Sequence, residues 1–112
     1  MKKSKLFQSW GTFRKGLDAQ SIQLSFASHL EYSLSKDQHT STNRDLYLSL
    51  ALAARDRLIE RWIKTQQKYY TDNVKRVYYL SAEYRLGRVL INTLINLDMY
   101  AESRKAMEEL SI

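Results

Sequence analysis

The amino-acid sequence predicts a mainly α-helical chain with one β-strand, in the order helix, loop, long helix, strand, helices. Apolar residues recur at four-residue spacing over long stretches, which is the pattern of one helix face. The chain has only 3 Gly and no Pro, so it lacks the residues that separate many short strands. One run, Val77 to Leu80, is apolar at consecutive positions, as in a strand buried on both faces.

The first two segments are predicted to be a flexible arm and a helix. Residues 1–17 are mostly basic and polar, which favours a loosely ordered basic arm. Residues 18–35 then carry an apolar face at four-residue spacing: Ile22, Phe26, Leu30 and Leu34. His29 lies beside this face. Since no acid or nucleophile lies near it in sequence, a half-buried packing histidine is the preferred interpretation over a catalytic one.

A long helix is predicted after a polar loop at residues 36–41. Thr42 followed three residues later by Asp45 is a capping box, so the helix should begin at Asn43. No Gly or Pro interrupts it before Asp72. The apolar residues at four-residue spacing are Leu46, Leu50, Ala54, Leu58 and Trp62. Further apolar residues widen this face, so the helix needs partners on more than one side.

Residues 75–84 are predicted to form the strand, after a turn at Asp72 and Asn73. The sequence offers no second convincing strand, and a lone strand cannot satisfy its own backbone hydrogen bonds. We therefore expect the sequence to require more protein than it contains. Two further helices are predicted, over residues 89–97 and 100–110.

Composition bounds the class of protein. The 112 residues suffice for one small domain, and 44% hydrophobic with 27% charged residues is typical of a globular chain. The absence of Cys excludes disulfides and thiolate metal sites, and His29 and His39 have no metal-ligand spacing. The basic start lacks an apolar core, so we expect no signal peptide, no membrane span and a cytoplasmic location.

The motif search predicts no catalytic residue and no metal ligand. Asp56 and Glu60 could form a carboxylate pair on one helix face, but the basic residues around them favour a solvated charged face. The tyrosines among basic residues could stack on nucleobases, yet their positions favour core packing. Glu83 ends the predicted strand, where enzymes often place working groups, but a structural ion pair with an Arg is preferred.

Two motifs carry a family resemblance. RWIKTQQKYY at residues 61–70 and YYLSAEYRLGR at residues 78–88 resemble the N-terminal part of the α-glucan phosphorylases, which act on glycogen, starch or maltodextrin. The similarity covers about residues 21–112. It implies that residues 18–112 are an incomplete N-terminal fragment of a larger α/β phosphorylase domain.

The resemblance also implies an activity. The family phosphorolyses the terminal α-1,4 bond of a glucan and releases α-D-glucose 1-phosphate, as a homodimer. It uses pyridoxal phosphate, held by a lysine far downstream of this stretch. We therefore expect no cofactor bound to this chain and little activity from it alone.

Finally, the resemblance implies an effector site. In animal members, residues matching Gln66, Gln67 and Tyr70 line a nucleotide site at the dimer interface. The loop matching Asp37 to Thr42 covers that site from the partner subunit, and the arginines that hold the phosphate would lie downstream. The position of Arg85 often carries Tyr or Leu near the cofactor, so the Arg here departs from the pattern.

An alternative comes from the net charge of +6. A small basic helical module could bind RNA or an acidic protein, although no specific nucleic acid is indicated. The two hypotheses predict different surfaces. A phosphorylase segment should expose apolar area around Leu50, Trp62 and Tyr78, whereas a binding module should bury those residues and show a contiguous basic patch.

Overall fold

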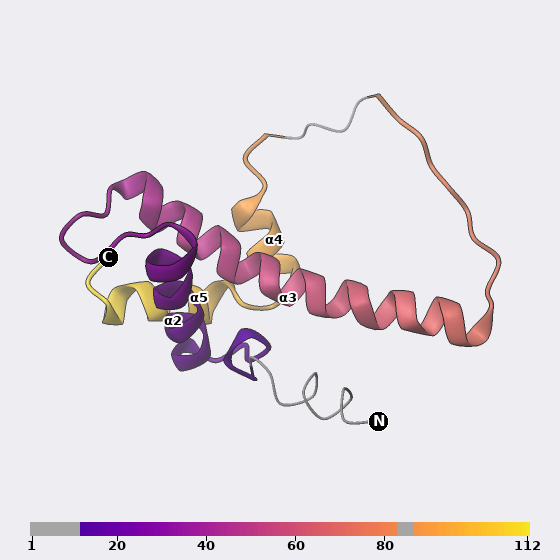
Figure 1. The fold of residues 1–112 in the computed structure, drawn as a ribbon, viewed down its shortest axis with the longest axis horizontal. Helices are drawn as coiled ribbons and strands as arrows, with labels where there is room; N and C mark the ends of the chain where they lie inside the picture. Colours follow the sequence, from indigo (N-terminus) through magenta and orange to yellow (C-terminus); the bar gives the residue numbers. More distant parts are fainter. Residues whose placement is uncertain (1–11, 83–86) are drawn as a thin grey trace.

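The computed structural model describes residues 12–82 and 87–112, and the elements in these ranges are helices. They are the 3₁₀ turn η1 (Thr12–Arg14), α2 (Ala19–Ser28), the π turn η2 (His29–Ser33), α3 (Asn43–Asp72), α4 (Leu90–Asn96) and α5 (Tyr100–Glu109). Figure 1 shows α2, α4 and α5 gathered around one part of α3, whose C-terminal half extends away from them. The prediction of a mainly helical chain is confirmed.

At the start of helix α2, two carboxylates accept hydrogen bonds from its free backbone amides. Asp18 accepts a hydrogen bond from the Ser21 amide at 3.0 Å, and Glu102 of α5 accepts one from the Ala19 amide at 3.2 Å. The bond to the Ser21 amide is the main reason why the pKa of Asp18 is lowered. Because Glu102 comes from another helix, this N-terminal cap also ties α5 to α2.

Helix α3 begins at Asn43 through the predicted capping box. The Thr42 hydroxyl accepts from the Asp45 amide at 3.3 Å, and the Asp45 carboxylate accepts from the Thr42 amide at 2.9 Å. The helix ends at Asp72, followed by Asn73 in the left-handed conformation. Its 30 residues correspond to a length of about 45 Å.

The apolar core lies between α2, the first half of α3, α4 and α5. Its three alanines let the helices approach closely. The buried members are Ala19, Ile22, Ala54, Leu94, Leu97, Met99 and Ala106. Three members of the predicted face of the first helix, Ile22, Phe26 and Leu30, are buried, and the fourth, Leu34, is half-buried. The second half of α3 differs from its predicted stripe, because Leu58 and Trp62 remain 44% and 61% exposed.

A buried arginine joins three elements of the fold. Arg57 of α3 is only 2% exposed, and its guanidinium donates at 2.9–3.3 Å to acceptors in η1, α2 and α3 and in the turn after η1. Burial lowers the pKa of Arg57 from its ordinary value. The acceptors are the carbonyls of Phe13, Gly16, Ser21 and Ala53 and the hydroxyl of Ser25.

The strand predicted over residues 75–84 is not found. The described residues 12–82 and 87–112 contain no strand, and Glu83 and Tyr84 lie outside them. Val77 to Leu80 are between 78% and 92% exposed. The reason is that a strand is held by a neighbouring strand, and no described segment supplies one. The larger α/β domain that the strand would join is likewise not seen in these residues.

Within the described part of the chain, no helix is both long and apolar enough to cross a membrane.

The capping box generates the first prediction. Thr42→Ala should lower the free energy of unfolding by about 1 kcal/mol, because it removes the acceptor for the Asp45 amide. Urea denaturation followed by circular dichroism measures the change. Thr71→Ala is the matched control, since its exposed hydroxyl donates to the Gln67 carbonyl within the same helix. Equal stability of the two variants would contradict the prediction.

The buried guanidinium generates the second. Arg57→Met should lower the free energy of unfolding by at least about 3 kcal/mol, because several carbonyl groups lose their buried donor. Arg55→Met, at an exposed position two residues earlier, should change it by less than about 0.5 kcal/mol. The same denaturation experiment compares the two variants. If Arg57→Met were as stable as Arg55→Met, the guanidinium of Arg57 would not organise the fold.

Candidate functional site

The three residues predicted to line an effector site lie together near the end of α3. Gln66 and Tyr70 are four residues apart and Gln67 and Tyr70 three apart, so all three share one side of the helix. Gln66 is half-buried and Gln67 is exposed, while Tyr70 is 74% exposed. The structure therefore presents these side chains on the part of α3 that projects from the helical body.

A cation that the sequence analysis did not single out lies against this group. The guanidinium of Arg76 sits 4.8 Å from the centre of the Tyr70 ring, a cation–π distance. Lys68 pairs with Asp72 at 2.6 Å, one turn away on the same helix. The signal in the sequence was the basic pair Lys75–Arg76, which comes after the turn and Val74. Amides, a phenol and a guanidinium can bind a polar anionic ligand, but they include no acid–base pair for catalysis.

The loop predicted to cover such a site lies at the other end of α3. The Asp37 carboxylate accepts from the Thr40 amide at 2.8 Å and the His39 amide at 3.0 Å. Together with the Thr40 hydroxyl, the largest cause, these bonds lower the pKa of Asp37. From Thr42 to Gln66 the helix rises about 36 Å. A single copy of the chain therefore cannot bring the loop and the Gln66 group together.

The carboxylate pair on α3 is not the solvated face that the sequence favoured. The Asp56 side chain is 13% exposed and pairs with Arg14 at 3.0 Å and His29 at 2.9 Å. Glu60 bridges Lys15 at 3.5 Å and Lys64 at 3.3 Å. The reason is that η1 and η2 pack against this side of α3, which pattern analysis of one helix cannot show.

His29 is buried, as a packing role requires, but it also has polar partners. Its side chain lies between Asp56 and the Ser33 hydroxyl, which is 2.8 Å from Nδ1. The acid is 27 residues away in sequence, which is why the sequence analysis missed it. Glu83 and Arg85, the other residues considered near a site, lie outside the described residues.

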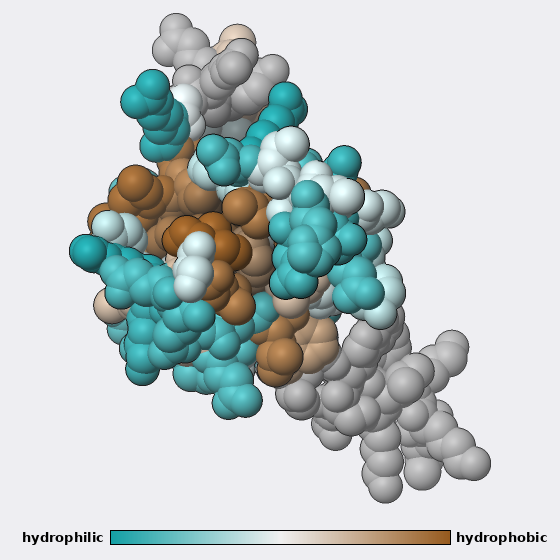
Figure 2. Space-filling model, turned by 90° about the vertical axis from the view of Figure 1, so that its left-hand side faces the viewer, coloured by the Kyte–Doolittle hydropathy of each residue, from teal (hydrophilic) through white to brown (hydrophobic). Residues whose placement is uncertain are grey.

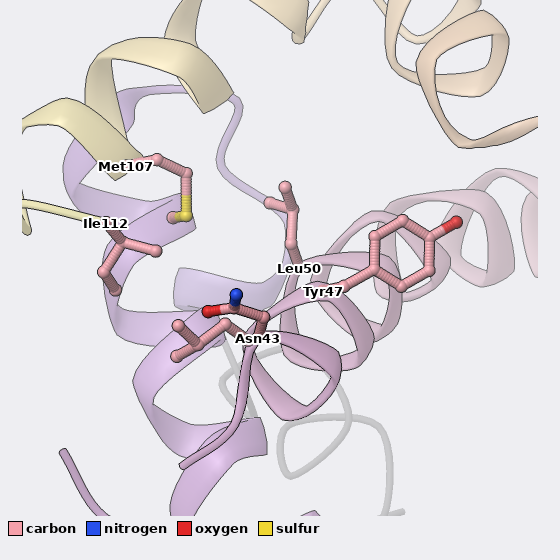
Figure 3. Close-up of a pocket in the computed structure, with 6 residues that line it drawn as sticks. Asn43, Tyr47, Leu50, Met107 and Ile112 are labelled. Atoms are coloured by element: carbon pink, nitrogen blue, oxygen red, sulfur yellow. The ribbon is translucent and has the colours of Figure 1, made fainter. Parts of the chain in front are cut away.

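A hollow of about 270 Å³ lies between the start of α3 and the end of the chain. Figure 3 shows Met107 and Ile112 on one side of it and Leu50 and Tyr47 on the other. The view from this end in Figure 2 shows apolar surface bordered by hydrophilic side chains. Asn43 contributes an amide and Tyr47 a phenol, and the lining side chains include no charged group.

No three His, Asp or Glu side chains gather into a metal-binding group within residues 12–82 and 87–112.

Comparison with known proteins identifies relatives. No protein-family model matches the chain. It is 44% identical over 95 residues to the brain form of glycogen phosphorylase from Bos taurus, and 46% identical over 91 residues to the human liver form. It is 43% identical over 91 residues to the muscle form from Ovis aries. These matches cover 81–85% of the chain but only 11% of each relative. By sequence, the chain therefore corresponds to an N-terminal segment of a glycogen phosphorylase.

Proposed function

We propose that this chain is part of an α-glucan phosphorylase, which phosphorolyses the terminal α-1,4 bond of a glucan in the cytoplasm and releases α-D-glucose 1-phosphate. The observation that carries the proposal is the identity of 42–46% to glycogen phosphorylases over most of the chain. Because the chain spans 11% of the length of these relatives, the activity is proposed for the longer assembly to which it contributes. Its partners there are the rest of a phosphorylase, the glucan and phosphate.

The described residues of this chain do not fit the pyridoxal phosphate of the family. A Schiff-base lysine needs a pocket that orients and encloses the cofactor. The six described lysines, at positions 15, 36, 64, 68, 75 and 105, are exposed or half-buried, and the hollow in Figure 3 has no lysine in its lining. We therefore assign no catalytic step to this chain, and the proposed role of its residues is structural and regulatory.

We propose that residues 75–84 become a strand inside a larger α/β domain when the rest of the enzyme is present. Val77 and Tyr79 would face one side and Tyr78 and Leu80 the other, since successive residues of a strand alternate. All four are exposed here although they are apolar or aromatic, which supports a surface that another part of the protein covers. The exposure of Trp62 on α3 supports the same covering.

We also propose that Gln66, Gln67 and Tyr70, with Arg76, form half of an effector site for a nucleotide in an allosteric homodimer. The ring and guanidinium at 4.8 Å suit a base and a phosphate, respectively. The loop at residues 37–42 would complete the site from a second copy, because the length of α3 keeps it about 36 Å away within one copy.

The alternative of a small basic module that binds RNA or an acidic protein gains no support. Trp62 and Tyr78 are exposed, as expected for a segment of a larger protein, although Leu50 is half-buried. Several cations are already paired with carboxylates on the surface of the described residues: Arg14, Lys15, Lys64, Lys68 and Arg104.

The proposal that no catalytic step belongs to this chain predicts that the isolated chain is inactive. Purified protein should release no glucose 1-phosphate from glycogen or maltodextrin and should carry no bound pyridoxal phosphate, so that its absorbance spectrum shows no aldimine band. The physical reason is that its described lysines lie at the surface, outside any enclosing pocket. A full-length glycogen phosphorylase assayed in parallel is the positive control. Product above the blank would contradict the proposal.

The proposed strand predicts the exchange behaviour of its backbone. In the isolated chain the amides of Val77 to Leu80 should exchange as fast as in an unstructured peptide, while those of Ile22 and Phe26 in α2 are protected. Hydrogen–deuterium exchange, with light scattering to detect association through the exposed segment, measures both. A monodisperse monomer with strong protection at residues 77–80 would show that the chain completes its own sheet.

A further inference from the structure

A serine, a histidine and a carboxylate form a continuous hydrogen-bonded chain outside the proposed effector site. The Ser33 hydroxyl lies 2.8 Å from Nδ1 of His29, and Nε2 of His29 lies 2.9 Å from Oδ2 of Asp56. A hydroxyl within reach of an imidazole that is itself oriented by a third group is the arrangement of an activated nucleophile. We propose that Ser33 is a reactive serine, with His29 as its general base and Asp56 as the residue that positions the imidazole.

The direction of each hydrogen bond follows from the groups involved. An ionised Asp56 only accepts, so Nε2 of a neutral His29 carries the proton and donates it to the carboxylate. Nδ1 is then unprotonated and accepts from the Ser33 hydroxyl. Nη1 of Arg14, 3.3 Å from Nε2, also donates to Asp56, so the guanidinium and the imidazole share one acceptor. The free lone pair of the imidazole therefore points at the serine.

The carboxylate is held from several sides. Asp56 accepts from Arg14 at 3.0 Å and from the Ser25 hydroxyl at 3.1 Å in addition to His29. Ser25 in turn accepts from the buried guanidinium of Arg57 at 2.9 Å. These bonds fix the carboxylate, and through it the imidazole, before any reaction takes place.

The serine itself remains open to reagents. Ser33 is exposed, whereas His29 is 7% exposed. The π turn η2, in which the Leu34 amide bonds to the His29 carbonyl at 3.0 Å, sets both residues on consecutive turns of the chain. Single π turns inside helices are frequent at functional sites. Access at Ser33 and protection at His29 are the two properties that a nucleophile and its base require.

The chemical class that fits is an activated phosphoric or carboxylic ester. With a fluorophosphonate, Oγ of Ser33 would attack phosphorus, the new O–P bond would form, and the P–F bond would break with release of fluoride. The hydroxyl proton would pass to Nδ1 of His29 and then to water. Arg14 is already bonded to Asp56, and Arg57 to backbone carbonyls, so neither guanidinium is free to stabilise the negative charge that develops when an adduct is hydrolysed. We therefore expect a stable adduct on Ser33 and no turnover.

The test is labelling of the full chain with a fluorophosphonate probe, followed by peptide mass spectrometry. Ser33 should react at least about 100-fold faster than the exposed Ser35, the scale that a positioned general base provides. Ser33→Ala should abolish the fast label, and Ser35→Ala, the matched control, should leave it unchanged. Both substitutions are at exposed positions, so both variants are expected to fold.

A further variant separates activation from exposure. His29→Asn removes the base while Ser33 stays at the surface, so labelling of Ser33 should fall to the rate of Ser35. Circular dichroism establishes that this variant is folded; if it is not, the comparison of Ser33 with Ser35 in the unmodified chain decides alone. Equal labelling of the two serines in that chain, or fast labelling that persists in a folded His29→Asn variant, would overturn the proposal.

Discussion

The fold depends on one buried cation. Arg57 occupies a place where a helix of this kind normally carries a small or apolar residue, and its donors reach η1, α2 and the chain between them. Such a group is tolerated only when its hydrogen bonds are satisfied. Arg57 follows Phe13 by 44 positions in the sequence, and its hydrogen bonds therefore hold the first described residues against α3. The bonded carbonyls of Phe13 and Gly16 lie in residues 12–17, which are the described part of the predicted flexible arm.

The two halves of α3 face different surroundings. In the first half, small residues such as Ser49 and Ala53 are fully buried and let α2 approach closely. In the second half, large residues such as Trp62 and Tyr70 are mostly exposed. Arg61 lies at the change, where its guanidinium donates to the Leu97 carbonyl at 3.2 Å, directly after α4. A helix that is packed at one end and apolar but uncovered at the other has a surface on which a second neighbour can pack.

What the sequence could predict was local. The capping box at Thr42 and Asp45 lies within four residues, and the face of α2 repeats at four-residue spacing, so both were found. The strand over residues 75–84 is not confirmed in the described residues, because the segments that would pair with it are not local. Arg57 was missed because an arginine among charged residues resembles a solvated face; its spacing after Ser49 and Ala53, at four residues each, was the available signal.

The distinction between local patterns and contacts between distant residues also explains which candidate site the sequence could predict. Gln66, Gln67 and Tyr70 were accessible to sequence comparison because they are close together on one helix, and the structure places them on one side of it. The hydrogen-bonded chain from Ser33 through His29 to Asp56 joins η2 to α3 and had no sequence signal at all. Arg57 and Arg14 hold η1 and α2 against α3, and this packing sets the geometry of the hydrogen-bonded chain. The polar groups that hold the helices together are thus the groups that orient the imidazole, and stability and reactivity rest here on one network.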